Sequence, residues 1–404
     1  SLFRSDTTYD TQATSLFLAM TKHYFKKRNR QMYQRFQHKT IIEINLDNLI
    51  FNFRSIKEKA GGATVIPVIK ANAYGHGAVM TAKTLIREGA GFFAVSKLEE
   101  ALELKDSGID VPILIFSRLF PDQLANAVKA DFRITLSCNE DIFWLEKANL
   151  PHPAFVHINV DTGFGGVGVR IDKESDFFDN LIHSSSCIWE GLYSQFSSSE
   201  EPDKTYSELQ LSRFKNILSD ICQKNKKPPM VHMANSAAIF NLPESHFDAV
   251  RPGISLYGHY LSPDLAEAIS LKPVMSFKTF VAQISEIDAG CPVSYGRKWI
   301  SKEKTRIAVL PVGFTDGIDR RLTNKGRVII KDKFYPMVGT IAMDRIMIDI
   351  GYDPIDIGDI VIIWGKSEEK QILLSHLSDI TGTSLFVLTC GIPQELKRKY
   401  ITKV

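Results

Sequence analysis

Apolar runs that alternate with helical patterns over roughly 230 residues constrain the fold of this chain more than any other feature. Strands that alternate with helices form a parallel sheet, because each helix returns the chain before the next strand begins. Eight such units close into a barrel. We therefore predict an α/β chain with a (β/α)8 barrel. The strand-like runs are residues 92–95, 113–116, 134–136, 155–160, 230–232 and 248–251, and the helical patterns are 96–107, 121–130 and 206–224.

The pattern changes after Lys272 and Pro273. Short β-branched runs separated by Gly and Asp replace the alternation, which is typical of an all-β domain. We divide the chain into a basic N-terminal extension (1–38), a barrel (39–272) and a mainly β C-terminal domain (273–404). The β-like runs are residues 277–287, 305–310, 327–330, 346–350 and 360–364.

A lysine at the end of the first predicted barrel strand is the strongest candidate for chemistry. Lys70 follows the apolar run 63–69 and precedes a small-residue turn and a helix predicted over 76–89. In α/β barrels the active site lies at the carboxyl ends of the strands. A partly desolvated lysine there is a usable nucleophile, as a Schiff base with pyridoxal 5'-phosphate (PLP) requires. The alternative is a lysine that ends the strand and extends into water, as most lysines do.

Five segments in one order resemble the alanine racemases, which are fold type III PLP enzymes with a TIM-like barrel. Residues 68–77 read VIKANAYGHG and match the family's lysine segment. The resemblance covers about residues 39–400, and it implies that the first strand, in 39–44, joins the C-terminal domain. The other segments are RPGISLYG (251–258), VSYGR (293–297), GFTDGIDR (313–320) and GTIAMDR (339–345).

The resemblance implies a racemase that interconverts L- and D-alanine with two bases. Lys70 would serve the D-enantiomer, and Tyr295 from the other subunit of a homodimer would serve the L-enantiomer. A tyrosine normally titrates near pH 10, so it needs polar or cationic neighbours to act as a base. Arg251 would face the pyridine nitrogen and keep it unprotonated, because a guanidinium retains its proton. Decarboxylases of this fold type use glutamate there, so Arg251 favours a racemase.

The resemblance also assigns residues to the cofactor phosphate and to the substrate. Phosphate binding needs hydroxyls and backbone N–H groups. An Asn-Ser pair in a loop is also ordinary turn chemistry. The assigned phosphate residues are Tyr74, Asn235, Ser236, Gly253 and Ile254, and the assigned substrate residues are Met343 and Asp344.

The resemblance further implies that the protein supplies D-alanine for peptidoglycan synthesis in the cytoplasm.

One strand lacks two charged residues of the family pattern. The family's Lys-x-Asp-Thr-Gly-Met-Gly-Arg reads NVDTGFGG over 159–166, so Asn159 replaces a carbamylated lysine and Gly166 replaces the arginine that holds the substrate. Asparagine cannot be carbamylated, and without the arginine no carbamate is needed. Another cation, with Arg170 and Arg320 as candidates, or a bound inorganic anion would then hold the substrate carboxylate.

Three further positions lose a polar contact. Gln195 replaces a family histidine beside Arg251, and Phe314 and Phe386 replace tyrosines. Each lost hydrogen bond costs on the order of 1 kcal/mol. We interpret the changes as a retuned pocket, which makes serine a rival substrate, as in the serine/alanine racemases. A PLP-binding protein without turnover is another alternative; short proteins of that kind lack the β domain, and the VSYGR segment opposes this interpretation.

The N-terminal extension is strongly basic. Residues 1–40 carry eight basic and two acidic residues, a net of +6 within a chain of +3, so the remainder carries −3. The run KKRNRQMYQR (26–35) fits a solvated helix, a contact with anionic lipid, a transit-peptide remnant or a nucleic-acid patch. One short run is too small for a nucleic-acid footprint, so we predict no nucleic-acid partner. A membrane tether or contact would match the membrane-tethered serine/alanine racemases.

Composition excludes several other classes of protein. The five cysteines have no CxxC spacing, which argues against a zinc site or a disulfide framework and favours a reducing compartment. The histidines show no HExxH spacing, so no metal is predicted. No apolar run approaches the ~18 residues that span a membrane. The predicted partners are a small amino-acid substrate and a second copy of the chain.

Overall fold

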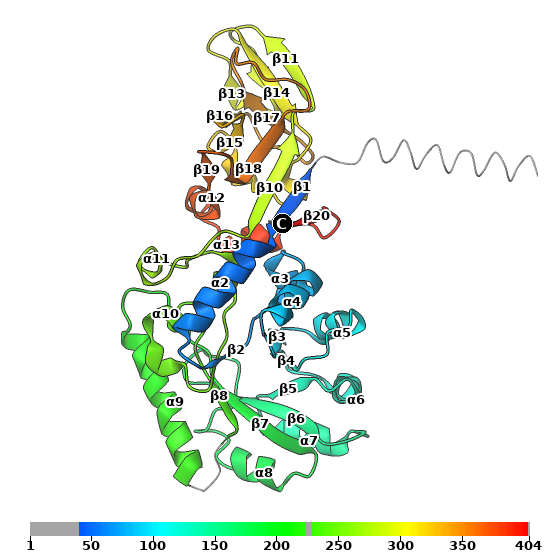
Figure 1. Ribbon diagram of the computed structural model, residues 1–404, viewed down its shortest axis with the longest axis vertical. Coiled ribbons are helices and arrows are strands. Elements are labelled where there is room, and N and C mark those ends of the chain that lie inside the picture. The colour runs from blue at the N-terminus through cyan, green and yellow to red at the C-terminus, as the bar shows by residue number, and fades with distance from the viewer. Residues whose placement is uncertain (1–39, 224–227, 403–404) are drawn as a thin grey trace, which may run out of the picture.

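The computed structural model describes residues 40–223 and 228–402. Figure 1 shows two parts stacked along the long axis, a lower part of strands surrounded by helices and an upper part that is mainly β. The extension predicted over residues 1–38 lies outside the described residues. In 40–223 and 228–402, no helix is long and apolar enough to cross a membrane, and no group of three or more His, Cys, Asp or Glu is placed to hold a metal.

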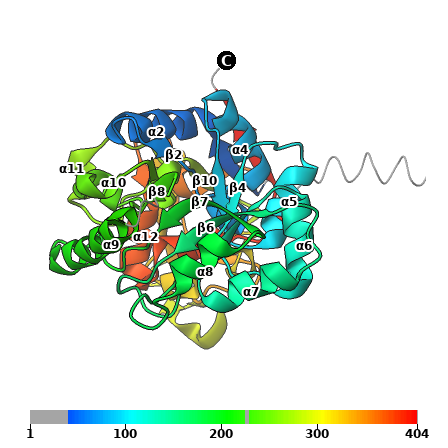
Figure 2. The ribbon, with the colours of Figure 1, turned by 90° about the horizontal axis from the view of Figure 1, so that it is seen from below.

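Eight parallel strands form the lower part in the order of the sequence. The sheet runs from β2 through β9 to β3, and a bridge between Val68 and Ala94 joins the chain beyond β2 to β3 and closes the ring. Figure 2 shows the helices around this ring. The strands are β2 (Thr64–Val65), β3 (Phe93–Val95), β4 (Ile113–Ile115), β5 (Arg133–Leu136), β6 (Ala154–Asn159), β7 (Cys187–Tyr193), β8 (Met230–His232) and β9 (Ala249–Val250). The predicted (β/α)8 barrel is confirmed.

The barrel helices show why these segments are helical. Helix α4 buries Ala78, Thr81, Ala82 and Leu85, which form one face at helical spacing. It begins two residues later than predicted because Gly77 has a φ of +99°, outside the helical region. The helices are α2 (Leu46–Lys59), α4 (Ala78–Arg87), α5 (Leu98–Asp106), α6 (Pro121–Lys129), α7 (Asn139–Lys147), α8 (Phe177–His183), α9 (Thr205–Gln223), α10 (Ala238–Asn241) and α11 (Leu265–Ala268), and the short element α3 (Lys70–Tyr74) is a left-handed turn.

The upper part is built on one large sheet. Its strand order is β11-β14-β17-β16-β15-β18-β10-β1-β20, with β19 added to β18. The first strand of the described chain, β1, runs antiparallel to β10 and parallel to β20, so it belongs to this sheet. The strands are β1 (Ile41–Asn45), β10 (Met275–Phe280), β11 (Gln283–Ile287), β14 (Thr305–Leu310), β15 (Arg327–Ile330), β16 (Lys333–Val338), β17 (Ile346–Asp349), β18 (Ile360–Lys366), β19 (Gln371–Ile372) and β20 (Arg398–Ile401), with a separate pair β12 (Pro292–Val293) and β13 (Trp299–Ile300).

One hydrophobic core continues from the barrel into the β part. Helices α12 (Leu374–Thr381) and α13 (Leu385–Cys390) follow the sheet, and α13 packs against α3 at the barrel mouth. The Arg398 side chain donates from Nε to the carbonyl of Gly75 at 3.1 Å. These contacts place the C-terminal segment directly over the strand ends where Lys70 lies.

Candidate active site

Lys70 and Arg251 lie at the carboxyl ends of neighbouring barrel strands. Strands β2 and β9 pair in parallel, and beyond them the N–H of Val68 donates to the carbonyl of Pro252 at 2.9 Å. Both residues therefore reach the same end of the barrel, one from each strand. This is the end at which α/β barrels carry their active sites.

A left-handed turn follows Lys70. Residues 71–74 all have φ between +52° and +54°, a conformation that costs non-glycine residues roughly 1–2 kcal/mol each. The Ala71 N–H donates to Oε1 of Glu100 at 2.5 Å. The Asn72 side chain accepts from the Ala78 N–H at 2.8 Å, and its carbonyl accepts from the Gly77 N–H at 2.9 Å. Strain of this kind persists only where the surroundings fix it, and it concentrates at functional sites.

The turn brings the Tyr74 hydroxyl against Gly253. A Cβ at Gly253 would lie 2.5 Å from that oxygen, so any other residue there would displace the Tyr74 ring. The Ser236 hydroxyl accepts from the Gly253 N–H at 2.9 Å. Ile254 opens the 3-10 turn η2 (Ile254–Tyr257), whose first N–H groups lack acceptors within the turn. Burial raises the pKa of Tyr74, so its hydroxyl stays a donor.

The other predicted phosphate residue, Asn235, lies beside this group. Its side-chain oxygen accepts from the Ala238 N–H at 3.1 Å and from the Ser199 hydroxyl at 2.8 Å. These two bonds fix the oxygen and leave the amide nitrogen as the group that can donate. The cradle formed by Tyr74, Ser236, Gly253, Ile254 and Asn235 thus offers hydroxyl and N–H donors, which is the donor set that a phosphate monoester needs.

Arg251 is fully enclosed by hydrogen-bond acceptors. It is 3% exposed, and burial lowers the pKa of its guanidinium to about 10, so it remains charged at neutral pH. In the described part of the chain, both Nη atoms donate to protein acceptors and Nε donates to none. That Nε–H fits a heterocyclic nitrogen such as the one in PLP. The acceptors are His232 Nδ1 (2.7 Å) and carbonyl (2.9 Å), the Ser194 carbonyl (2.7 Å), Gln195 Oε1 (3.0 Å) and the Met233 carbonyl (3.2 Å).

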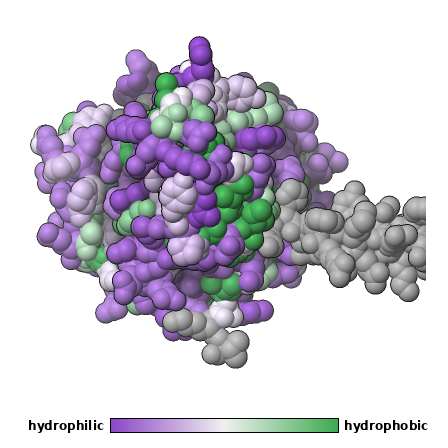
Figure 3. Space-filling view, turned by 90° about the horizontal axis from the view of Figure 1, so that it is seen from above, coloured by the Kyte–Doolittle hydropathy of each residue, from purple (hydrophilic) through white to green (hydrophobic). Residues whose placement is uncertain are grey.

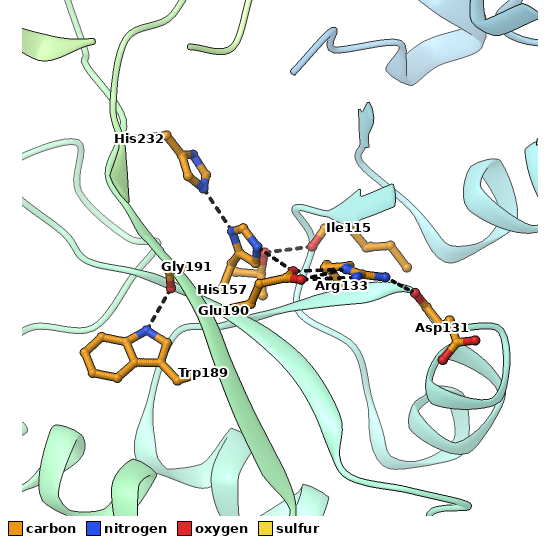
Figure 4. A network of polar contacts seen from close by, with 9 residues as sticks. Ile115, Asp131, Arg133, His157, Trp189, Glu190, Gly191 and His232 are labelled. Carbon is orange, nitrogen blue, oxygen red and sulfur yellow. Dashed lines mark hydrogen bonds and ion pairs between the residues drawn. The ribbon is translucent and has the colours of Figure 1, made fainter. Parts of the chain in front are cut away.

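Polar residues inside the barrel continue from Arg251. His232 contacts His157, which contacts Glu190, and Glu190 pairs with Arg133, as Figure 4 shows for these four residues. None of the four was predicted as a site residue. The available signal was a histidine inside a predicted buried strand (155–160), where an apolar residue is the norm.

The remaining predicted residues form a second group on the β part. Tyr295 opens the turn η3 (Tyr295–Arg297) and is 72% exposed, and Met343 is 59% exposed. The Tyr295 carbonyl accepts from the Thr340 hydroxyl at 2.7 Å, while Asp344 pairs with Arg345 at 3.1 Å. Within 40–223 and 228–402, no hydrogen bond, ion pair or ring contact joins Tyr295 or Asp344 to Lys70. Figure 3 shows apolar side chains gathered into a patch on the face seen from above, in a surface that is otherwise mostly hydrophilic.

Comparison with known proteins assigns the chain to a family. The alanine racemase N-terminal domain matches residues 44–261, and the alanine racemase C-terminal domain matches residues 274–400. Alanine racemase 1 of Caldanaerobacter subterraneus subsp. tengcongensis is 39% identical over 362 residues, which cover 88% of this chain and 91% of the relative. The alanine racemase of Carboxydothermus hydrogenoformans is 37% identical and covers 89% and 98%. This chain belongs to the alanine racemase family.

Solved structures agree with this assignment. The alanine racemase of Clostridium difficile 630 superposes with a TM-score of 0.86 at 31% identity, covering 91% of this chain and 97% of that one. The Bacillus anthracis alanine racemase with bound L-Ala-P also gives 0.86, at 30% identity and with coverage of 91% and 96%. The predicted family, fold and enzyme class, a racemase and thus an isomerase, are confirmed. The alanine racemases are PLP-dependent.

The structure shows what surrounds the positions that depart from the alanine racemase pattern. Asn159 ends β6 and is 6% exposed. Gly166 has a φ of +90°, and no atom lies within 4 Å of where its Cβ would be, so the space beside it is open. The Gln195 side-chain oxygen accepts from Arg251 at 3.0 Å, so this position keeps a hydrogen bond to the arginine. The Phe386 ring centroid lies 5.8 Å from that of Tyr74.

The two cations predicted as substitutes differ in their surroundings. Arg170 forms two hydrogen bonds with Asp172, at 3.1 and 2.8 Å, so its charge is already compensated. Arg320 is exposed and lies with its guanidinium 6.0 Å from the Phe314 ring centroid. Of these two, Arg320 is the one whose charge is left for a ligand.

Proposed function

We propose that the protein interconverts L- and D-alanine with PLP bound at Lys70. The observation that carries this proposal is the arrangement of Lys70 and Arg251 on adjacent strand ends, with a phosphate cradle beside them, in a chain of the alanine racemase family. When bound, PLP makes the α-proton of an attached amino acid acidic. The residues of the chain do the rest: they hold the cofactor, orient the substrate and move the proton.

Each part of the cofactor has a matching group in the barrel. Tyr74, Ser236 and the backbone at Gly253 and Ile254 would hold the phosphate, with the Asn235 amide beside them. Arg251 would donate from Nε to the ring nitrogen. Because the guanidinium keeps its proton, the nitrogen stays unprotonated and the ring withdraws fewer electrons, which restrains side reactions.

Two bases on opposite faces would move the α-proton. The Lys70 amine would take or return it on one face, and Tyr295 of the partner subunit on the other. Tyr295 is 72% exposed in a single chain and has no contact with Lys70 there, which is the arrangement expected if the two bases belong to different subunits. Met343 and Asp344 would reach the substrate from the same side as Tyr295.

A second copy of the chain would complete the site. Besides Tyr295 and Met343, the barrel loop after β6 exposes Phe164 and Val167, each by 51%. Exposed apolar side chains on both parts are typical of a surface that another protein covers. A symmetric dimer would pair the β part of one chain with the barrel mouth of the other and form two equal sites. The cytoplasm is the compartment that the free cysteines favour.

Serine is the second candidate substrate. The open space beside Gly166 would accommodate a larger substrate or an added polar group. Gln195 brings an uncharged amide next to Arg251 where the family pattern has histidine. Both changes favour a substrate with one more hydrogen-bonding group than alanine.

The first test is racemisation of L-alanine and L-serine by the purified chain with PLP, followed by chiral chromatography. The Lys70→Ala variant should lose turnover and the absorbance of bound PLP, whereas Lys105→Ala, which removes an exposed lysine paired with Asp110, should change neither. Turnover of serine equal to that of alanine would establish the serine/alanine alternative. Bound PLP without turnover of either amino acid would contradict both proposed substrates and favour a different substrate or a non-catalytic PLP-binding protein.

Subunit mixing tests the shared site. Lys70→Ala and Tyr295→Phe homodimers should each be inactive, but a mixed dimer would contain one site with both bases intact. Random exchange should restore about a quarter of wild-type activity, since half of the dimers are mixed and each has one good site. No recovery after verified exchange would contradict Tyr295 acting across the interface.

Contact of the N-terminal segment with anionic lipid stays a prediction, because residues 1–39 lie outside the described chain. Flotation with neutral and with anionic vesicles, for the full chain and for a variant without residues 1–40, would test it. Binding that needs both the anionic lipid and the segment would support it.

A further inference from the structure

A single line of hydrogen bonds runs through the barrel from Arg251 to Glu190. Arg251 Nη1 lies 2.7 Å from Nδ1 of His232. His232 Nε2 lies 2.9 Å from Nδ1 of His157, and His157 Nε2 lies 3.0 Å from Oε2 of Glu190. Both imidazoles are fully buried. Figure 4 shows His232, His157 and Glu190 in sequence across the barrel interior.

The donors in this line all point the same way. A guanidinium can only donate, so His232 must accept at Nδ1 and carry its proton at Nε2. His157 must then accept at Nδ1 and carry its own proton at Nε2, which it donates to the Glu190 carboxylate. Burial lowers the pKa of His157 and of His232, so both rings are neutral at neutral pH. The line therefore has a cation at one end, an anion at the other and two neutral dipoles between them.

The backbone of β7 is shaped around this line. The β6–β7 pairing shifts register between Val156 and His157, so Glu190 is the extra residue of a bulge. Bulges turn a side chain away from its regular direction and often lie beside active sites. The next residue is Gly191, and a Cβ there would lie 2.2 Å from Nδ1 of His157. The bulge thus turns Glu190 toward His157, and the glycine makes room for the ring.

The hydrogen-bond partners of Arg251 are all neutral, so the charge that compensates its guanidinium lies further away. Its contacts are carbonyls, the Gln195 amide and His232. A buried ion without a counter-charge is costly unless an opposite charge reaches it through hydrogen bonds. Glu190 also accepts from Arg133 at 2.9 Å, and this contact fixes the carboxylate. The Arg133 side chain is 15% exposed, so solvent partly screens its positive charge.

We propose that Glu190 is a positioning residue that compensates the charge of Arg251 and fixes its orientation through His157 and His232. This inference rests on the proposed function, since Arg251 is the residue assigned to the cofactor nitrogen. Through the line, Glu190 polarises both imidazoles toward Arg251 and holds the guanidinium with its Nε–H aimed at the ligand. A role confined to pairing with Arg133 is the simpler alternative that the experiment must separate.

The experiment uses the full chain, first without and then with PLP. The ¹⁵N NMR spectrum of the imidazoles in the PLP-free protein should show His157 and His232 neutral with the proton on Nε2. Glu190→Gln removes the charge with little change of shape; it should shift the His232 resonances, two residues along the line, and weaken PLP binding about three- to thirtyfold with a changed absorption spectrum. Glu88→Gln is the matched control, because Glu88 is 17% exposed on its side chain and also pairs with an arginine, Arg54, at 2.7 Å.

A second variant separates the line from the ion pair. Gly191→Ala forces the His157 ring away while both charges of the Glu190–Arg133 pair remain, so it should change PLP affinity and spectrum as Glu190→Gln does. An Nδ1–H tautomer of His232, or a folded Glu190→Gln protein with the wild-type spectrum and PLP affinity, would overturn the inference. Wild-type protein that binds no PLP would refute the proposed function instead. The NMR measurement would still test whether the hydrogen bonds from Arg251 to Glu190 run as described.

Discussion

The fit of His157 over Gly191 gives the most demanding prediction about stability. The Gly191→Ala substitution places a methyl group 2.2 Å from Nδ1 and 2.4 Å from Cε1 of the His157 ring, so the ring must move. Moving it breaks one neutral hydrogen bond, to His232, and one to the charged Glu190. Hydrogen bonds of these kinds contribute roughly 0.5–1.5 and 1.5–3 kcal/mol, so the substitution should lower the free energy of unfolding by about 2–4 kcal/mol.

A double-mutant cycle tests this reasoning. His157→Ala removes the ring, after which the methyl group at position 191 has room. The double variant should then be about as stable as His157→Ala alone, which gives an interaction energy of about 2–4 kcal/mol. Urea unfolding at a fixed chain concentration measures all four proteins, since a dimer's stability depends on concentration.

Gly91→Ala is the matched control for the backbone. Gly91 also lies in the barrel, but no atom lies within 4 Å of its built Cβ and its φ is not in the left-handed region. That substitution should change the free energy of unfolding by less than about 1 kcal/mol. Additive costs of Gly191→Ala and His157→Ala would refute the argument, because they would mean that the two side chains do not compete for one space.

Three further predictions concern strain, pH and bicarbonate. The φ of Ala71 is +52°, a conformation that glycine adopts without strain and valine adopts poorly. In thermal unfolding, Ala71→Gly should therefore stabilise the protein by about 1 kcal/mol and Ala71→Val should destabilise it. Equal effects of the two substitutions would contradict the left-handed turn. Burial lowers the pKa of His76 to about 3 and of His259 to about 4, below the unfolded value near 6.5. Unfolding therefore takes up protons below pH 6.5, and the free energy of unfolding should fall with falling pH by up to ~1.4 kcal/mol per pH unit for each histidine. Urea midpoints that do not change between pH 7 and 5 would contradict this. Removing bicarbonate should leave racemisation unchanged because Asn159 cannot be carbamylated, and a strong loss would show that another lysine holds the carbamate.

Local patterns were sufficient to predict the barrel, whereas Lys70 was singled out by the resemblance of its segment to that of the alanine racemases. The alternation of apolar runs and amphipathic stretches gave seven of the eight barrel strands, counting the run before Lys70 as β2. Strand β7 was missed because Glu190 and Gly191 interrupt its apolar run, and the bulge there supplies the physical reason for that pair. The small residues after Lys70 predicted a turn, but its handedness depends on contacts to Glu100 and Ala78 that no local pattern encodes.

The line from Arg251 to Glu190 could not be read from sequence for a different reason. Its members are separated by 19, 75 and 33 positions, and they meet only if three strand registers and one bulge are correct. A shift of one residue in β7 would turn Glu190 out of the barrel. The local hints were two histidines within predicted strands, His157 and His232, and that pattern also fits ordinary buried histidines.

This polar interior links the stability of the barrel to the electrostatics of its site. The interior of such a barrel is usually filled with branched apolar side chains, because they bury no polar atom. Here Thr135 donates to the Ile115 carbonyl at 2.7 Å and contacts the Tyr193 hydroxyl at 3.0 Å, and the Tyr193 ring stacks on His232 at 5.0 Å between centroids. Along the line from Arg251 to Glu190, each hydrogen bond runs in one direction, so removal of a member leaves its neighbour without a partner in a dry environment. Substitutions that alter the charge at Arg251 should therefore also lower the free energy of unfolding, and a variant that changed the cofactor spectrum without any loss of stability would show that the barrel interior tolerates an unpaired member.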